Sequence, residues 1–180
     1  APEPEVVPRR WELRLEPGQL RIASITLPDR PAQQYLYMTY REINNSGQDV
    51  LFAPTFELAN GEGDILRSGR EVPQAVVNRL KQEAQNAAVE DQIQIIGELL
   101  QGEENARHGL VVWPVKDLSP ESLTVYASGF SGETATVENP TTKERTVLRK
   151  TAKLDYENPG NLVGQGNKPL SVMTRQWIMR

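Results

Sequence analysis

The chain has 180 residues, of which 38% are hydrophobic and 24% charged, so it can build one folded domain and is not a disordered chain. Its 20 basic and 24 acidic residues give a net charge of −4, which argues against nucleic acid as a partner. It contains no cysteine, which excludes disulfides and thiolate metal sites, and no apolar run of about 18 residues, so we expect no membrane insertion.

Residues 1–10 are rich in proline, and we expect them to form a flexible tail. Such a segment is typical of what remains after a signal peptide is cut, or of a place where a longer sequence was cut. The absence of cysteine says little about the compartment. We favour the signal-peptide interpretation, which predicts a periplasmic or extracellular protein.

The first third of the chain predicts strands, because apolar and polar residues alternate between turn residues. Strand 11–16 ends at Pro17-Gly18, which predicts a turn and a pairing with strand 20–27. Strand 35–43 is rich in aromatic residues and ends in the turn Asn44-Asn45-Ser46-Gly47. Pro54 marks an edge or a bulge in strand 50–58, and Asn60-Gly61 predicts a hairpin that returns through 64–66.

The spacing changes to that of helices between residues 73 and 102. Apolar residues recur every four positions, and the segment opens with Pro73 and closes with Gly102; the recurring residues are Val76, Leu80, Ala84 and Ala88. Asp91 is placed to cap a second helix whose apolar residues are Ile93, Ile96, Leu99 and Leu100. We therefore expect a two-helix insertion.

Strand patterns return after residue 108, and they predict strands 109–113, 122–127, 133–137, 145–148, 152–157 and 171–179. The strands 133–137 and 145–148 form a hairpin turned through 139–143, and the segment 159–167 is a loop. Eight or nine strands around one helical insertion predict a mainly β, antiparallel sandwich in which residues 11–180 form a single domain.

Residues 37–49 resemble extracellular bacterial immunoglobulin-like domains, in which an aromatic strand ends in an Asn/Gly turn. Residues 109–114 and 118–126 are similar to the later strands of the same class, where a tyrosine near a strand end bonds back across the corner. The resemblance implies an immunoglobulin-like β-sandwich in a secreted bacterial protein. It implies no activity, because this fold carries many functions.

Residues with catalytic chemistry are present without the required spacing. His108 is the single histidine, and alone it cannot build a histidine metal site. Ser131 lies in Gly129-Phe130-Ser131-Gly132, which does not meet the G-x-S-x-G spacing and is explained by a β-turn. Three carboxylate pairs could serve glycoside hydrolysis: Asp117 with Glu121, Glu133 with Glu138, and Asp155 with Glu157. The pair Asp155 and Glu157 could also form a weak calcium site.

Two further motifs have ordinary explanations. Segment 160–166 lacks the spacing, lysine and hydroxyl of a phosphate loop, and Asn44-Asn45-Ser46 is a glycosylation sequon that also suits a turn. We assign no catalytic, cofactor-binding or metal-binding residue, and we expect a protein that is not an enzyme.

The aromatic residues remain, and they could anchor a partner or stack on sugars if they face water: Trp11, Trp113, Trp177, Tyr35, Tyr37 and Tyr40. Strand alternation places most of them in the core. We therefore expect a non-catalytic extracytoplasmic structural or protein-interaction module that binds another protein or a cell-surface component. The alternative is a carbohydrate-binding or glycan-processing domain that uses these aromatics with a carboxylate pair.

Overall fold

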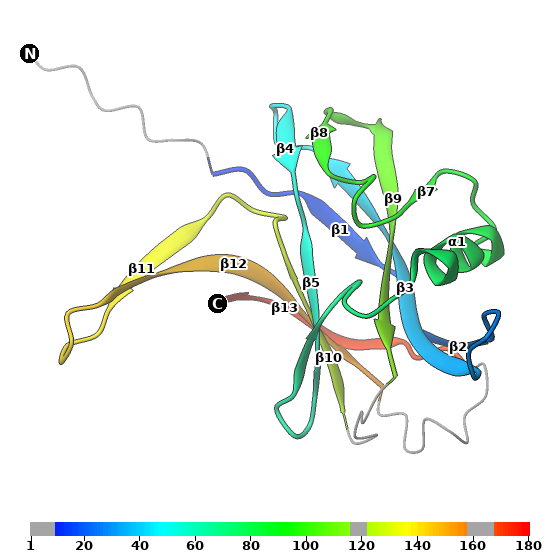
Figure 1. Cartoon of the computed structure of the whole chain (residues 1–180). Coiled ribbons are helices and arrows are strands. Elements are labelled where there is room, and N and C mark those ends of the chain that lie inside the picture. Colours follow the sequence, from blue (N-terminus) through cyan, green and yellow to red (C-terminus); the bar gives the residue numbers. More distant parts are fainter. Residues whose placement is uncertain (1–9, 116–121, 158–167) are drawn as a thin grey trace, which may run out of the picture.

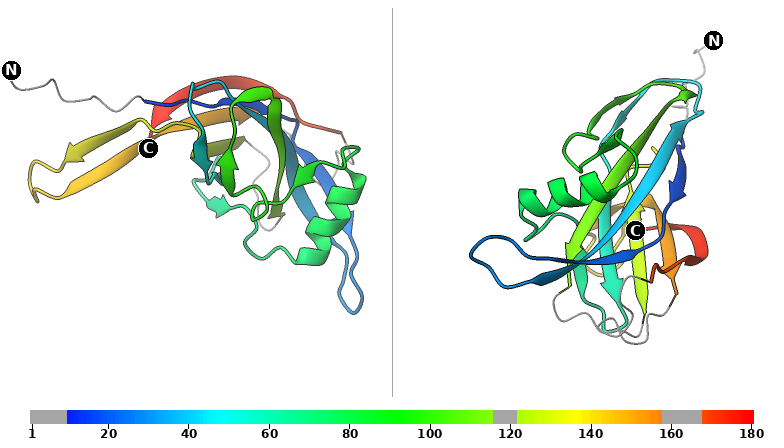
Figure 2. Two further views of the ribbon diagram at one scale, coloured as in Figure 1. Left: turned by 90° about the horizontal axis from the view of Figure 1, so that it is seen from above. Right: turned by 90° about the vertical axis from the view of Figure 1, so that its right-hand side faces the viewer.

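Two β-sheets pack face to face in the computed structural model, which describes residues 10–115, 122–157 and 168–180 (Figure 1). The strands pair antiparallel, apart from one short parallel pair, so the predicted mainly β, antiparallel class is confirmed. One helix stands against the outer side of one sheet (Figure 2).

The first sheet has the order β1-β3-β9-β7, with β2 also paired to β3. Its strands are β1 (Arg14–Pro17), β2 (Arg21–Ile25), β3 (Gln33–Asn44), β7 (Val89–Glu90) and β9 (Gly102–Pro114). The predicted pairing of the first two strands is wrong, because both run one after the other along the same edge of β3. The backbone at Gly18 stays against β3, where its N–H donates to the Thr39 carbonyl at 2.9 Å.

The second sheet has the order β11-β12-β10-β5-β6, with β13 also paired to β12. Its strands are β5 (Thr55–Asn60), β6 (Ile65–Arg67), β10 (Leu123–Ser128), β11 (Thr134–Glu138), β12 (Arg145–Tyr156) and β13 (Val172–Met179). The sequence predicts two strands where β12 is continuous. Its first half pairs with β11, and its second half lies between β10 and β13.

Two short strands, β4 (Val50–Phe52) and β8 (Gly97–Leu99), form a small sheet of their own at one end of the molecule (Figure 1). The predicted strand 50–58 is divided here into β4 and β5, with Pro54 between them. Proline cannot donate to a ladder, so the chain leaves one sheet at Pro54 and joins the other.

The core between the two large sheets is formed by their alternating inward residues. Rings of Phe52, Phe56 and Phe130 meet edge to face at 5.1 and 5.8 Å between centroids, and Tyr40 packs against Phe56 at 4.6 Å. Trp113 is fully buried and donates its indole N–H to the Leu66 carbonyl at 3.0 Å. The contacts between these rings and the hydrogen bond of Trp113 have preferred geometries, so they fix how the two sheets are stacked.

The helix α1 (Gln74–Glu83) packs Val76 and Leu80 against the outer face of the first sheet, as the spacing predicts. The predicted second helix is wrong. Asp91 accepts hydrogen bonds from the N–H groups of Ile93 and Gln94, both at 2.9 Å, but the turn ends at once and the chain continues as β8. Pairing with β4 outweighs the local helical pattern, and Gly97 takes a positive φ of 156° there.

Candidate functional site

A β-hairpin formed by β11 and the first half of β12 projects from the body of the molecule, and we call residues 134–149 the arm (Figures 1 and 2). Its turn is built locally. The Asn139 side chain accepts hydrogen bonds from the N–H groups of Thr141 and Thr142 at 2.9 and 3.2 Å, and Lys143 adopts a φ of 61°. Threonine and valine, which favour strands, occur in both, and the antiparallel pairing of β11 with β12 confirms the predicted hairpin.

The base of the arm is held by side chains from distant parts of the chain. Lys150 donates to Glu12 at 2.8 Å and lies 3.2 Å from Glu133, with its ammonium 5.3 Å from the Trp177 ring centroid. Arg10 also pairs with Glu133 at 3.2 Å. These contacts fix the direction of the arm relative to the sheets.

The arm exposes one valine on each of its faces. Val147 is 59% exposed and lies between Arg145 and Arg149 on one face, because residues two apart on a strand point the same way. Val137 is 47% exposed and lies on the opposite face. Neither Arg145 nor Arg149 forms an ion pair within the described ranges. The first face therefore carries Val147 between two arginines, and Glu138, the cross-strand partner of Arg145, lies on the same face.

A second exposed apolar surface lies on the outer side of β4 and β8, and we call it the tip. Leu51 is 75% exposed and is paired directly with Glu98. Ile96 and Leu100 lie just before and just after β8, two residues on either side of Glu98, and they are 52% and 47% exposed. Asp49, two residues before Leu51, is also exposed. The tip is thus an apolar surface with two carboxylates.

A groove of about 640 Å³ runs between the end of α1 and the first sheet. Its floor holds Tyr37, Thr39 and His108, and its walls include Arg21, Glu83 and Asn86. His108 lies inside β9, between Arg41 of β3 and Val89 of β7. Burial raises the pKa of the Tyr37 hydroxyl, with opposing smaller effects of Arg21 and Glu83.

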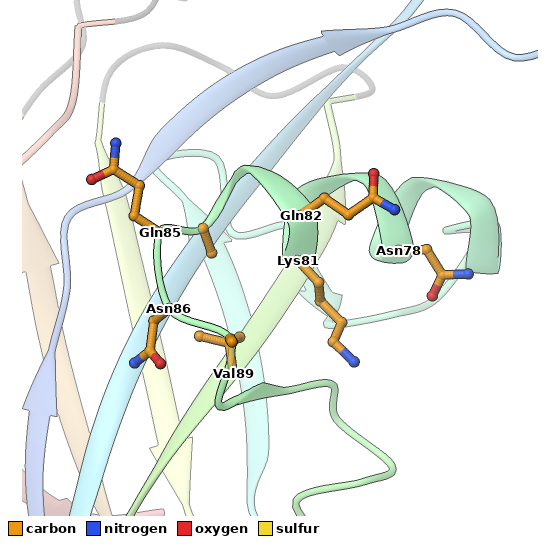
Figure 3. Close-up of a pocket in the computed structure, with 8 residues that line it drawn as sticks. Asn78, Lys81, Gln82, Gln85, Asn86 and Val89 are labelled. Carbon is orange, nitrogen blue, oxygen red and sulfur yellow. The ribbon is translucent and has the colours of Figure 1, made fainter.

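A neighbouring hollow of about 600 Å³ shares part of its lining with this groove, namely Ala84, Gln85, Asn86 and Val89. Figure 3 shows Asn78, Lys81 and Gln82 on the helix and Asn86 and Val89 beyond it. The Lys81 ammonium donates to the Gln94 side chain at 2.7 Å. Four of the eight residues that line this hollow carry amide side chains, and such groups suit polar contacts better than proton transfer.

The predicted carboxylate pairs are not brought together where the structure describes them. Glu133 stands at the base of the arm and Glu138 near its turn, five residues further along an extended strand. Glu157 accepts the Ser171 N–H at 3.0 Å, whereas Asp155 faces Thr124 and Thr174. Asp117 and Glu121 lie outside the described residues, as does the segment 160–166.

Asp155 has two hydroxyl partners on the outer face of the second sheet. Thr124 on β10 and Thr174 on β13 donate to its two oxygens at 2.7 and 2.8 Å. Burial acts to raise the pKa of this carboxyl, but the two hydroxyl hydrogen bonds and Lys153 outweigh it and the pKa is lowered. The Asp155 carboxylate therefore stays charged, and its hydrogen bonds link β12 to β10 and β13.

The serine and sequon motifs both prove to be turns. Ser131 accepts the Glu133 N–H at 3.1 Å, and the preceding Gly129 has a φ of 94°. Asn44 is buried and its amide donates to the carbonyls of Gln48 and Leu99 at 2.7 and 2.9 Å. Its nitrogen is therefore occupied inside the fold.

The tryptophans and tyrosines of the described ranges are buried or partly buried, and none of them is fully exposed. Trp113, Tyr35 and Tyr40 are core residues, as alternation predicts. Trp11 and Trp177 are partly buried around the base of the arm. The carbohydrate alternative stays a prediction that a glycan array can test.

A buried acidic residue, Glu42, was missed by the search for catalytic motifs. It points into the core beside Tyr40, and neither the Glu42 carboxyl oxygens nor the Tyr40 hydroxyl has a hydrogen-bond partner in the described structure. Burial raises the pKa of Glu42 to about 8; Arg107 opposes this shift and Glu90 adds to it. The sequence does indicate that Glu42 is buried, because it follows Leu36, Met38 and Tyr40 at every second position of the strand.

Comparisons with models of protein families, with curated proteins and with solved structures found no match. The described residues hold no group of three or more His, Cys, Asp or Glu side chains arranged for a metal ion. In the same ranges no helix has the length and apolar character needed to cross a membrane.

Proposed function

We propose that the chain is a non-catalytic, extracytoplasmic protein-interaction module, and that the arm is its binding element. The observation that carries this proposal is a two-stranded ribbon that leaves the sandwich with exposed valines on both faces. An isolated two-stranded ribbon is at best marginally stable in water. A partner that covers the arm would supply the third layer or strand that it lacks.

The rigid base of the arm supports the same function. Lys150, Glu133 and Glu12 form a charged cluster there, and the N–H and C=O groups of Arg149 exchange hydrogen bonds with Arg180 at 2.9 and 3.0 Å. An element held in one direction loses less conformational freedom on binding than a free loop. The arm is therefore suited to present a small, defined surface.

Photo-cross-linking tests whether the arm contacts a protein. Benzoylphenylalanine at position 147 is irradiated in intact cells of the source organism, and the adducts are identified by mass spectrometry. We expect a discrete adduct with a polypeptide. The matched control places the probe at Ile65, an exposed apolar residue of β6 that is 50% exposed. Equal or absent adducts at the two positions contradict the proposal.

A shortened arm gives a second readout. Replacing residues 136–147 by Asn-Gly joins Ala135 and Leu148, which are a cross-strand pair, through a two-residue turn. We expect the variant to keep the thermal stability of the body and to lose the adduct formed by a probe at Thr134. A retained adduct excludes the outer arm as the contact.

The extracytoplasmic location and the immunoglobulin-like class belong to this proposal. Support for the class comes from two facing antiparallel sheets, and support for the location from the resemblance carried by residues 37–49. Fractionation of the source organism, with detection of the native chain outside the cytoplasm, tests the location.

A further inference from the structure

The arm and the tip are complementary surfaces of one chain. On the arm, Val147 lies between Arg145 and Arg149; on the tip, Leu51 and its apolar neighbours surround Glu98. Glu98 forms no ion pair within the described ranges. The arm face carries two arginines and one carboxylate, Glu138, whereas the tip carries the carboxylates of Glu98 and Asp49, so the two surfaces have opposite net charges. Such complementarity favours one partner orientation over others.

We propose that the arm of one copy binds the tip of a second copy of this chain. The inference rests on the proposed function, because it names the partner of the arm. In one molecule the arm and the tip project from different sides, so the arm cannot reach its own tip (Figures 1 and 2). The contact is therefore between copies.

This contact joins two different surfaces, so it is heterologous. After one such contact, one copy still has a free tip and the other still has a free arm. Repetition of such a contact produces a ring when the rotation closes and a filament when it does not. A symmetric contact between two arms would stop at a dimer, which gives the two arrangements different signatures in solution.

The exposed side chains of the two surfaces are the residues that would carry the contact. Val147 would pack among Leu51, Ile96 and Leu100, while Arg145 and Arg149 reach Glu98 and Asp49. Exposed ion pairs weaken with added salt, whereas apolar packing does not weaken in the same way. Association should therefore decrease, without vanishing, as the ionic strength rises.

Sedimentation velocity of the purified full chain tests the proposal between about 10 µM and about 1 mM, the range of weak interfaces. We expect concentration-dependent oligomers larger than a dimer. Val147→Asp and Leu51→Asp should each give monomers when studied alone. Both residues are exposed, so circular dichroism should report an unchanged fold for each variant.

Mixing the two variants gives the decisive result. The Leu51→Asp chain has an intact arm and the Val147→Asp chain an intact tip, so an equimolar mixture should form a heterodimer and nothing larger. Val137→Asp, on the opposite face of the arm, and Ile65→Asp, on β6, are matched controls that should associate like the unaltered chain.

The outcomes separate the two proposals. A chain that is monomeric throughout this range, or a Leu51→Asp variant that still forms oligomers, overturns the arm-to-tip contact. If a probe at position 147 then cross-links a different protein, the proposed function stands without self-association. If it cross-links no protein, both proposals fail.

Discussion

Glu42 and Arg107 are direct cross-strand neighbours on β3 and β9, yet they do not form an ion pair. Arg107 instead pairs with Glu90 of β7, its Nε donating to that carboxylate at 3.2 Å and a second nitrogen bonding the other oxygen. Glu42 is left as a buried acid with no hydrogen-bond partner in the described structure. Burial of this kind favours the neutral form of a carboxyl group.

The first prediction concerns the pH dependence of stability. The folded Glu42 carboxyl has a pKa of about 8 against an ordinary 4.5, so the unfolded chain ionises first as the pH rises. The contribution of neutral Glu42 to the free energy of unfolding is therefore fully present below pH 4.5. It decreases as the pH rises from 4.5 to about 8. At about 1.4 kcal/mol per pKa unit, the loss is up to about 5 kcal/mol.

Replacing Glu42→Gln removes this ionisation. We expect the variant to be more stable than the unaltered chain at pH 8 and to show a flatter pH profile in urea unfolding. Glu98→Gln, an exposed carboxylate, is the control and should keep the original slope. If the free energy of unfolding changed equally with pH in the unaltered chain and in the Glu42 variant, this carboxyl would not be the cause of the pH dependence.

The second prediction concerns Asn44, which joins the turn 44–48 to Leu99 on β8. Asn44→Ala leaves the Gln48 and Leu99 carbonyls without its amide, which should lower the free energy of unfolding by about 2–3 kcal/mol. Asn45→Ala changes an exposed neighbour and should cost under about 0.5 kcal/mol. If both variants lowered the free energy of unfolding by similar amounts, the hydrogen bonds of Asn44 would not stabilise this turn.

The third prediction concerns Asp155. Its pKa is lowered by the hydroxyls of Thr124 and Thr174 despite burial, so its stabilising effect is present above pH 3.8 and lost as the pH falls through the lower folded value. Carbon-detected NMR should place the Asp155 midpoint below 3.8. Thr174→Val removes one donor and should raise that midpoint, whereas Thr136→Val, on the arm, should leave it unchanged.

The fourth prediction concerns the contact between Gly109 and Tyr40. A Cβ at Gly109 would lie 2.2 Å from the Tyr40 ring, so Gly109→Ala should destabilise the protein by about 1–3 kcal/mol. Gly63→Asn is the control: space there is open, and asparagine tolerates the positive φ of 89°. A Gly109 variant as stable as the control would mean that the ring moves aside freely.

The sequence predicted most strands because alternation is a local property. It correctly placed the hairpin now seen as the arm, but not its position outside the sandwich. That position depends on how far β12 extends past β10, which no local pattern encodes. For the same reason the pairing of β1 and β2 was wrong: a Pro-Gly turn is compatible with a hairpin and with a strand that continues along one neighbour.

The prediction of a second helix is wrong for a different reason. Ile93, Ile96, Leu99 and Leu100 have helical spacing, but only Leu99 is buried among them. The segment instead forms a strand because it pairs with β4, which lies 45 or more residues earlier in the chain. Intrinsic helix propensity is weak compared with such tertiary pairing. Glu42 could have been found from the sequence, because alternation alone places it among core residues.

The base of the arm has a kinetic consequence. Lys150 is tied to Glu12 across 138 positions, and Arg180 to Glu57 across 123. Contacts so distant in sequence raise the contact order, and chains with high contact order fold slowly because loop entropy is lost before the contacts form. The hairpin is local and can form early, whereas its direction depends on these distant contacts and should be acquired late.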